Sequence, residues 1–310
     1  MLGEKAGPFA ALDCGTNSTR LLVVGADGAV LDRQMRVTRL GEGVDATGTL
    51  ARGAVDRTLA VLADYRKTIH SLGVAAARLV ATSAVRDATN GADFLAAAGE
   101  VTGVDAELLS GEEEGRLAYA GATHDLPPAA GDDVVLDIGG GSTELVVERD
   151  GVLRAVSLRL GCVRLTERHL RHDPPTAAEL AAAVAAIGSE LDRAVAAVPA
   201  LGALRSGSRL LGLAGTVSTL TMLDRRLDRY ERDRVHHAVL DLAAVTHWCG
   251  VLAGEPAAAR ARRPGMDPGR EDVIVGGAMV LREVMERFGF DRCLVSEADI
   301  LDGLVLSLRG

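Results

Sequence analysis

Two short segments of this sequence combine an aspartate, glycines and several hydroxyl side chains. The first holds Asp13, Gly15, Thr16, Asn17 and Ser18, and the second holds Asp137, Gly139, Gly140, Gly141, Ser142 and Thr143. A glycine-rich turn has no Cβ atoms to keep an anion away, so its backbone N–H groups and neighbouring hydroxyls can bind phosphate oxygens. A carboxylate beside bound phosphate is a usual ligand of Mg²⁺. The residue types therefore predict metal-assisted phosphate chemistry.

The two segments belong to an internal repeat. FAALDCGTNSTRLLVV begins at Phe9 and VVLDIGGGSTELVV begins at Val134, and setting Asp13 against Asp137 also brings Ser18 against Ser142. Each copy reads as a strand, a tight turn and a second strand, and an Asp-Gly pair then predicts a hairpin to a third strand. A single such turn is as well explained as an ordinary hairpin. Two copies with their aspartates in register favour phosphate binding.

Helical patterns follow each copy, the longest over residues 50–73 and 176–198. Repeated units of this kind predict an α/β fold of two similar domains that face each other across a cleft. We expect the domains at 1–125 and 126–310, with the option that a helix of residues 297–310 packs back on the first. The arrangement resembles the actin, sugar-kinase and heat-shock-chaperone (ASKHA) superfamily. That resemblance implies two actin-like, ribonuclease-H-like domains, each with one phosphate-binding hairpin.

Hydrolysis of phosphate also needs a group that orients or deprotonates water, and carboxylates near the turns are the candidates. Glu144 directly follows the second turn, whereas its counterpart in the first copy is Arg20. Three further glutamates, 112–114, begin a predicted helix. Acidic residues in a first helical turn usually interact with the helix dipole in solvent, and we expect that role for two of the three.

A set of motifs in order resembles the exopolyphosphatase and guanosine-pentaphosphate phosphohydrolase family (Ppx/GppA) over nearly the whole chain. The motifs are DCGTNSTRLLV, ATSAVRDATN, LLSGEEEGRLAYAGA, VLDIGGGSTELVV, LRLGCVRLTER, GLAGTVSTL and GREDVIVGGAMVL. The resemblance implies that Glu114 is the catalytic glutamate and that Arg86 faces the phosphate chain. It also implies metal ligation by Asp13, Asp137 and Glu144, the last also acting in catalysis. A loop between Gly212 and Thr219, with Gly215 and Thr216, would complete the second phosphate site.

Two departures from the family pattern bear on the substrate. The chain ends soon after Leu306, and longer members carry an additional C-terminal helical domain. The resemblance therefore implies a short form that is less processive or prefers shorter chains. In VSEADILDG, Asp302 stands where the family usually has an arginine–glutamate pair, which leaves the substrate choice open.

Two other patterns have simpler explanations. Cys14 and Arg20 have the C-x5-R spacing of cysteine-dependent phosphatases, but a strand, not the required helix, is predicted after Arg20, so Cys14 is expected to be a buried apolar residue. His236 and His237 are adjacent, and adjacent residues of a strand point to opposite faces, so we do not expect them to share a metal ion. Among the arginines that follow the second repeat, we expect only Arg164 to contact a polyanion.

The composition narrows the class of protein. The 310 residues carry a formal net charge of −9 and only 3% aromatic residues, so a polyanion must be bound by local groups, and stacking on single-stranded nucleic acid is disfavoured. The four cysteines form no CxxC pair, and neither a signal pattern nor a membrane-length apolar run is present. We expect a cytoplasmic protein with no nucleic-acid or membrane partner, and the family resemblance leaves a homodimer open.

The leading prediction is hydrolysis of terminal phosphate from inorganic polyphosphate, with Mg²⁺ as cofactor and Mn²⁺ or an added monovalent cation left open. The rival within the same chemistry is hydrolysis of guanosine pentaphosphate (pppGpp), a nucleotide of the stringent response. Two alternatives of other classes are a non-hydrolytic nucleotide- or polyphosphate-binding regulator and a kinase that passes phosphate to an acceptor. The scarcity of aromatic residues for a base-stacking pocket favours polyphosphate.

Overall fold

A computed structural model describes residues 7–309 of the chain. Its contacts divide the chain into two compact units, of which the first comprises the described residues through Gly121 and those from Asp299 onward, and the second Ala122–Ala298. The sequence placed residues 126–310 in the second domain, with the option that the last helix packs back on the first, and in this division residues 299–309 belong to the first unit. The last helix, α13 (Ile300–Arg309), belongs to the first unit because it packs on that unit's sheet.

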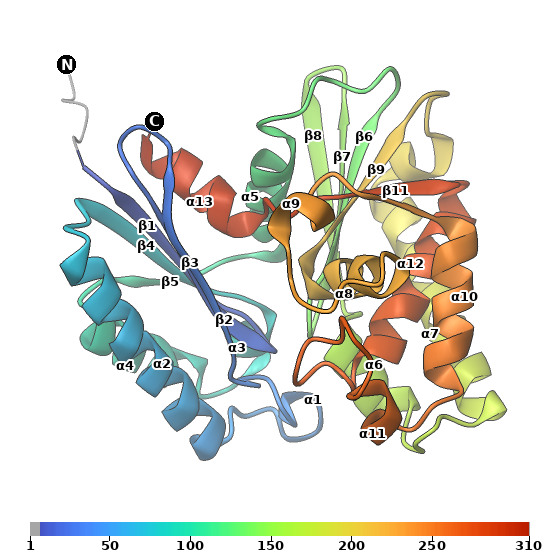
Figure 1. The fold of residues 1–310 in the computed structure, drawn as a ribbon, viewed down its shortest axis with the longest axis horizontal. Coiled ribbons are helices and arrows are strands. Elements are labelled where there is room, and N and C mark those ends of the chain that lie inside the picture. Colours follow the sequence, from blue (N-terminus) through green and yellow to red (C-terminus); the bar gives the residue numbers. More distant parts are fainter. Residues whose placement is uncertain (1–6, 310) are drawn as a thin grey trace. The chain divides into compact units, whose positions relative to one another are not determined.

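The first unit holds a five-stranded sheet in the order β3-β2-β1-β4-β5 (Figure 1). Strands β1, β2 and β3 are antiparallel neighbours, whereas β1, β4 and β5 run parallel. The elements of this unit are β1 (Phe9–Cys14), β2 (Ser18–Val24), β3 (Val30–Val37), α1 (Val44–Thr47), α2 (Arg52–Ser71), β4 (Ala76–Ala81), α3 (Ser83–Asp87), α4 (Gly91–Thr102), β5 (Ala106–Leu108), α5 (Gly111–Thr123, whose last two residues fall in the second unit) and α13.

The second unit holds a six-stranded sheet in the order β10-β11-β9-β6-β7-β8. Its elements are β6 (Asp133–Ile138), β7 (Thr143–Arg149), β8 (Val152–Leu158), α6 (Cys162–His169), α7 (Ala177–Ala197), the 3₁₀ helix η1 (Pro199–Ala203), β9 (Arg209–Leu213), α8 (Ala214–Asp224), α9 (Arg232–Val235), β10 (Val239–Asp241), α10 (Leu242–Ala253), α11 (Ala257–Arg260), α12 (Ile274–Phe288) and β11 (Arg292–Val295).

When β10 is left out of the count, the strands numbered within each unit have the order 3-2-1-4-5 in both sheets, and β10 is an extra antiparallel edge strand of the second. In both, the first two strands form the predicted hairpin around the glycine-rich turn, and the first, fourth and fifth strands are parallel. The sequence repeat is thus a repeat of topology. The predicted α/β class and the pair of actin-like domains are confirmed.

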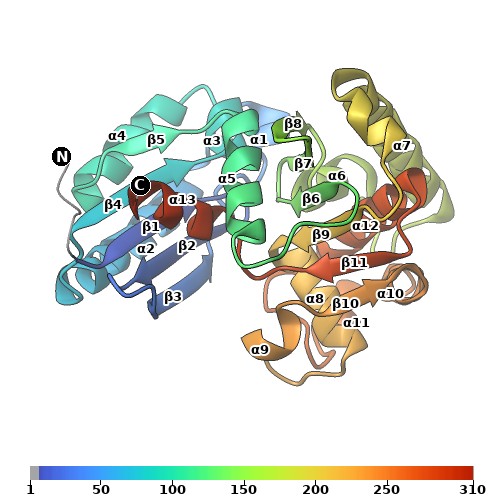
Figure 2. The ribbon, with the colours of Figure 1, turned by 90° about the horizontal axis from the view of Figure 1, so that it is seen from above.

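Each unit has its own apolar core on one face of its sheet. In the first, alternate residues of β1 and β2, such as Leu12 and Leu21, pack with Leu62 and Tyr65 of α2, and α2 and α4 lie together along this sheet (Figure 2). In the second, Leu136 of β6 lies in one cluster with Ile187 of α7 and with residues of α8, α10 and α12. The period-two alternation of the strands leaves the intervening residues, Asp13 and Asp137 among them, for the opposite face.

One segment differs from the expected secondary structure, and a short helix, α3 (Ser83–Asp87), directly follows the end of β4. The expected loop between Gly212 and Thr219 is the end of β9 followed at once by α8, which begins at Ala214 with a positive φ of 66°. None of the helices in residues 7–309 combines the length and apolar character that a membrane crossing requires.

Candidate active site

The two hairpins present the same register of charged residues. Asp13 of β1 lies directly opposite Arg20 of β2, and Asp137 of β6 lies directly opposite Glu144 of β7. Residues directly opposite in an antiparallel pair have side chains on the same face, about 5 Å apart. The first hairpin therefore presents an acid beside a base, and the second presents two acids.

The first turn is held closed by its own backbone. The N–H of Gly15 donates to the carbonyl of Ser18 at 3.0 Å, and a Cβ on Gly15 would lie 3.1 Å from that oxygen. The Thr16 hydroxyl is 3.0 Å from the hydroxyl of Ser83 at the start of α3. The Asn17 side chain is buried, and its Nδ2 has no hydrogen-bond partner among the described residues. A buried amide without a partner is costly unless a ligand or water supplies one.

Asp13 is engaged on one oxygen only. Arg20 donates to Oδ2 of Asp13 through Nη2 at 2.6 Å and Nε at 3.0 Å, and it also pairs with Asp299 at the start of α13. Oδ1 of Asp13 is buried and has no hydrogen-bond partner within residues 7–309. Burial raises the pKa of Asp13 in spite of Arg20, whereas Arg20 and Arg33 hold the pKa of Asp299 below its ordinary value against the effect of burial.

The second turn repeats the design of the first. A Cβ on Gly139 would lie 3.0 Å from the carbonyl of Ser142, which matches the distance at Gly15. The carbonyls of Gly139 and Gly140 accept hydrogen bonds from the first N–H groups of α6, and Arg164 of α6 donates through Nε to the carbonyl of Gly141 at 2.6 Å. Arg164, expected to contact a polyanion, is buried and braces this turn.

The polar groups that follow the second turn are almost fully buried. Thr143 is 0% exposed, and its hydroxyl has no hydrogen-bond partner in the described part of the chain. Glu144 is 1% exposed and accepts a hydrogen bond from Ser157 of β8 at 2.7 Å. Asp137 is 8% exposed. Two buried carboxylates side by side repel each other unless a cation or a proton lies between them, so this pair fits a divalent metal ion.

The three glutamates of α5 are distinguished by burial. Glu112 forms an exposed ion pair with Arg116, and Glu113 accepts from the N–H and hydroxyl of Ser110 just before the helix. Glu114 alone turns inward and is 9% exposed. Its Oε2 lies 3.4 Å from Nη1 of Arg86, which also donates to the carbonyl of Leu109 at 2.7 Å. The structure thus brings together two of the predicted catalytic residues, Glu114 and Arg86.

Gly215 and Thr216 lie in the first turn of α8, where backbone N–H groups without helical partners favour an anion. A Cβ on Gly215 would lie 1.9 Å from Cζ of Arg270, so the guanidinium of this buried arginine covers the turn. Arg270 is a candidate site residue that the sequence analysis missed. The sequence pointed to Arg270 only through its place in the GREDVIVGG motif. Arginines are common, and its 55-residue separation from Gly215 gives no indication that the two meet.

The cysteine-phosphatase pattern finds no support in the geometry. Cys14 is buried in the core of the first unit, and burial, with Asp13 adding to it, raises the pKa of its thiol far above the ordinary value. Arg20 pairs with Asp13 and Asp299 instead. The expectation that Cys14 is a small core residue agrees with its burial.

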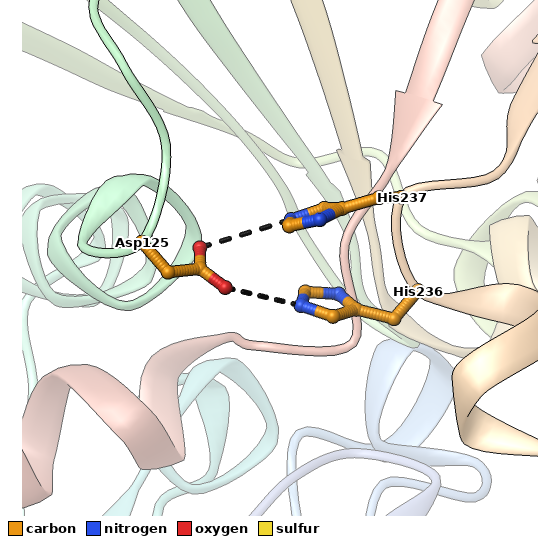
Figure 3. Close-up of side chains that lie close together, drawn as sticks. All are labelled: Asp125, His236 and His237. Atoms are coloured by element: carbon orange, nitrogen blue, oxygen red, sulfur yellow. Dashed lines mark hydrogen bonds and ion pairs between the residues drawn. The ribbon is translucent and has the colours of Figure 1, made fainter.

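The reason given for expecting that His236 and His237 do not share a metal ion does not hold. They do not lie in a strand, and their rings stack on each other on one side of the chain, facing Asp125 (Figure 3). The reason is the backbone of His237, whose φ of 59° is left-handed. Side chains alternate between faces only where the backbone is extended.

Two sheets that share a strand order, each with an aspartate-bearing glycine hairpin, define a protein of two actin-like units. The chain belongs to the Ppx/GppA phosphatase family, whose sequence profile matches residues 23–309. It is therefore an enzyme of the phosphatase class.

Similar proteins agree with this membership. The chain is 42% identical to Exopolyphosphatase 2 of Mycobacterium tuberculosis, over 97% of this chain and 98% of that protein. It is 33% identical to the guanosine-5'-triphosphate,3'-diphosphate pyrophosphatase of Vibrio cholerae, over 68% of this chain and 42% of that protein. A crystal structure of an exopolyphosphatase-like protein superposes with a TM-score of 0.90 and 35% identity, covering 96% of this chain and 98% of the other.

Proposed function

We propose that this protein is an exopolyphosphatase that removes the terminal phosphate from inorganic polyphosphate. The observation that carries the proposal is the second hairpin, where the glycine-rich turn is followed by the opposed, buried carboxylates of Asp137 and Glu144. Backbone N–H groups of a glycine-rich turn are suited to phosphate oxygens, and two opposed carboxylates are suited to a divalent cation. The similarity to Exopolyphosphatase 2 along both chains supports polyphosphate as the substrate.

Each part of the mechanism is assigned to groups of this chain. The turns at Gly15 and Gly139, and the first turn of α8, bind phosphate oxygens through backbone N–H groups and hydroxyls. Glu114 orients a water molecule and accepts its proton as the water oxygen bonds to the terminal phosphorus. The bond from that phosphorus to the bridging oxygen breaks, which releases orthophosphate and a chain shorter by one phosphate. Arg86 stabilises the charge on the transferred group.

Asp137 and Glu144 are the residues that would hold Mg²⁺, and Oδ1 of Asp13 is the oxygen of the first hairpin that is left for a metal or its water. When bound, Mg²⁺ supplies charge neutralisation to the phosphate oxygens. Asp13 is the weaker candidate ligand because Arg20 already neutralises its carboxylate.

A basic cavity in the second unit favours a long polyanion over a nucleotide. The cavity has a volume of about 190 Å³ and is lined by Arg159, Leu160, Arg164, Leu165, Arg168, His169, Ala186, Ser189 and Glu190. Arg164 connects it to the second turn through its bond to the Gly141 carbonyl. The lining offers cationic groups and no aromatic ring except an imidazole, as expected for phosphate groups rather than a stacked base.

The test is phosphate release with Mg²⁺ from medium-length polyphosphate and from pppGpp, measured in parallel for wild type, Glu114→Ala and Glu112→Ala. We expect release from polyphosphate that falls about 10²- to 10⁴-fold in Glu114→Ala, the usual contribution of a general base, with polyphosphate binding retained. Glu112→Ala is the matched control on the same helix and should keep wild-type activity. Release from pppGpp alone would assign the rival activity to the same site. Binding of polyphosphate without release from either substrate would point to a regulatory protein instead.

A further inference from the structure

Asp125, His236 and His237 form a cluster of imidazole and carboxylate groups (Figure 3), and none of them is among the residues assigned to phosphate chemistry. Asp125 follows the end of α5, and His236 and His237 follow α9, yet their ligand atoms all lie within 4.8 Å of one another. Oδ2 of Asp125 is 3.2 Å from Nε2 of His236, and Oδ1 is 3.7 Å from Nε2 of His237. Three potential ligands from distant parts of the sequence therefore converge on one point.

The backbone fixes the two histidines in this arrangement. The left-handed φ of 59° at His237 turns both rings to the same side, and their centroids are 3.8 Å apart. The N–H of His237 donates to the carbonyl of Val295 at 2.7 Å, and the N–H of His236 donates to the carbonyl of Arg232 at 2.7 Å. A non-glycine residue in this conformation is strained by about 1 kcal/mol or more, and such strain is often retained where it serves a site.

The hydrogen bonds define the protonation of His236. The N–H of Glu297 donates to Nδ1 of His236 at 3.0 Å, so the neutral ring carries its proton on Nε2 and donates it to Asp125. A metal ion would occupy the place of that proton between the imidazole and the carboxylate. Binding at Nε2 moves the ring proton to Nδ1, so the ring must also release the Glu297 N–H.

The nearby charges are mixed. Nδ1 of His124 lies 4.0 Å from Oδ1 of Asp125, so a third imidazole lies beside the carboxylate. The positive charge of Arg232 acts on His236 and would repel a cation bound there. The side chains of His236, His237 and Asp125 are 13%, 35% and 37% exposed. Solvent therefore reaches the cluster and can complete a coordination shell.

We propose that Asp125, His236 and His237 bind a divalent transition-metal ion of the zinc class. Two imidazoles and one carboxylate are ligands that Zn²⁺, Co²⁺ and Ni²⁺ prefer, whereas Mg²⁺ prefers oxygen ligands alone. Ligands bonded at 2.0–2.1 Å in a tetrahedral shell are about 3.3 Å apart. The carboxylate–imidazole distances of 3.2 and 3.7 Å here run to different oxygens of Asp125, so the side chains must draw in slightly around one ion. The site uses none of the residues assigned to Mg²⁺ or phosphate.

The experiment titrates the full chain, freed of metal, with Co²⁺ and follows the visible d–d absorption, then measures displacement by Zn²⁺. We expect one ion per chain in wild type, and a loss of at least about tenfold in affinity for His237→Ala, His236→Ala and Asp125→Asn. His172→Ala is the matched control, since His172 also forms an exposed pair with a carboxylate, Glu179, but lacks the second imidazole. It should bind Co²⁺ as wild type does.

Asp125→Asn keeps the test valid if a histidine variant unfolds, because Asp125 is exposed and the substitution preserves its shape. Thermal unfolding of each apo variant shows whether it is folded. The proposal is overturned if folded Asp125→Asn binds Co²⁺ as tightly as wild type, if His172→Ala loses affinity equally, or if wild type gives no d–d absorption. Phosphate release plays no part in these readouts, so the result is independent of the proposed activity.

Discussion

At the scale of single residues, the two hairpins differ in one position with large electrostatic consequences. Arg20 and Glu144 occupy the same register position, so Asp13 has a guanidinium beside it where Asp137 has a carboxylate. Because Arg20 already offsets the negative charge of Asp13, a bound cation adds little stabilisation there. A cation beside Asp137 and Glu144 would relieve the repulsion between two negative charges. The two aspartates of the repeat are therefore not equivalent as metal ligands.

This asymmetry predicts unequal effects of the same substitution. Asp137→Asn should raise the Mg²⁺ concentration for half-maximal phosphate release by about tenfold or more, while Asp13→Asn should raise it much less. The measurement is phosphate release as a function of Mg²⁺ at saturating polyphosphate. Equal shifts in the two variants would mean that Arg20 does not neutralise Asp13 in the working enzyme.

At the scale of elements, glycines in two helices let α5 and α13 approach closely in the first unit. A Cβ on Gly303 of α13 would lie 2.0 Å from the carbonyl of Leu117, and one on Gly121 of α5 would lie 1.8 Å from the carbonyl of Asp299. The helix that carries Glu114 is thus positioned by direct backbone contact with the last helix of the chain.

Gly303→Ala should therefore displace α5 as well as strain the core. We expect a loss of about 1–3 kcal/mol in the free energy of unfolding, the range for overpacking, together with a fall in kcat. Gly188→Ala in α7 is the control, since a Cβ there meets nothing within 4 Å, and it should stabilise the protein by about 0.5–1 kcal/mol. Denaturant unfolding and phosphate release measure the two effects. Unchanged stability in Gly303→Ala would contradict the close packing.

Ion pairs of Asp132 connect the start of β6, a central strand of the second unit, to neighbouring segments. Asp132, fully buried just before β6, accepts hydrogen bonds from Arg149 of β7 at 2.6 and 3.0 Å and from Arg205 at 2.7 Å. Arg149 and Arg205 hold the pKa of Asp132 well below its ordinary value. The strand that leads into the second turn is anchored by these contacts.

Asp132→Asn should lower the free energy of unfolding by about 2–3 kcal/mol at pH 7. This loss is smaller than that from breaking a fully buried ion pair, because both arginines reach solvent. The folded-state pKa lies below the unfolded value of about 3.9, so this stabilisation is complete above that value and is lost as the pH falls below it. Denaturant unfolding between pH 7 and pH 3 should show the difference between wild type and variant shrinking below about pH 4. A difference that stays constant with pH would exclude this carboxylate as its source.

At the scale of the whole molecule, an acidic chain must bind a polyanion against its own field. The net charge of −9 repels polyphosphate at long range, so binding depends on local cations, metal and backbone N–H groups. The cavity lined by Arg159, Arg164 and Arg168 is such a local concentration of positive charge. It lies beside α6, whose first residues bind the carbonyls of the second turn.

Arg168→Ala should therefore raise KM for medium-length polyphosphate about 3- to 10-fold and leave kcat within about twofold, as expected for a group that binds ground and transition states alike. Arg171→Ala is the matched control, because Arg171 is exposed and is not among the residues that line the cavity. Steady-state kinetics on polyphosphate and on triphosphate separate chain binding from chemistry. An equal effect of both variants would exclude the cavity from the path of the chain.

What could be predicted from the sequence was local and repeated. The repeat around Asp13 and Asp137, the two glycine turns and the order of motifs are read along the chain, because a turn's residue types reflect its own backbone geometry. These patterns determined the α/β class, the paired actin-like topology and the phosphatase family. They also indicated that only one of the three glutamates of α5 differs from the other two.

Tertiary structure alone decided which side chains meet. Arg20 pairs with Asp299, 279 residues away, and Arg270 covers Gly215, because packing brings together groups whose separation in the sequence carries no signal. His236 and His237 converge because one left-handed residue overrides the alternation that a strand would impose. Local patterns specify the elements, whereas the long-range contacts that tune charge depend on how the sheets and helices pack.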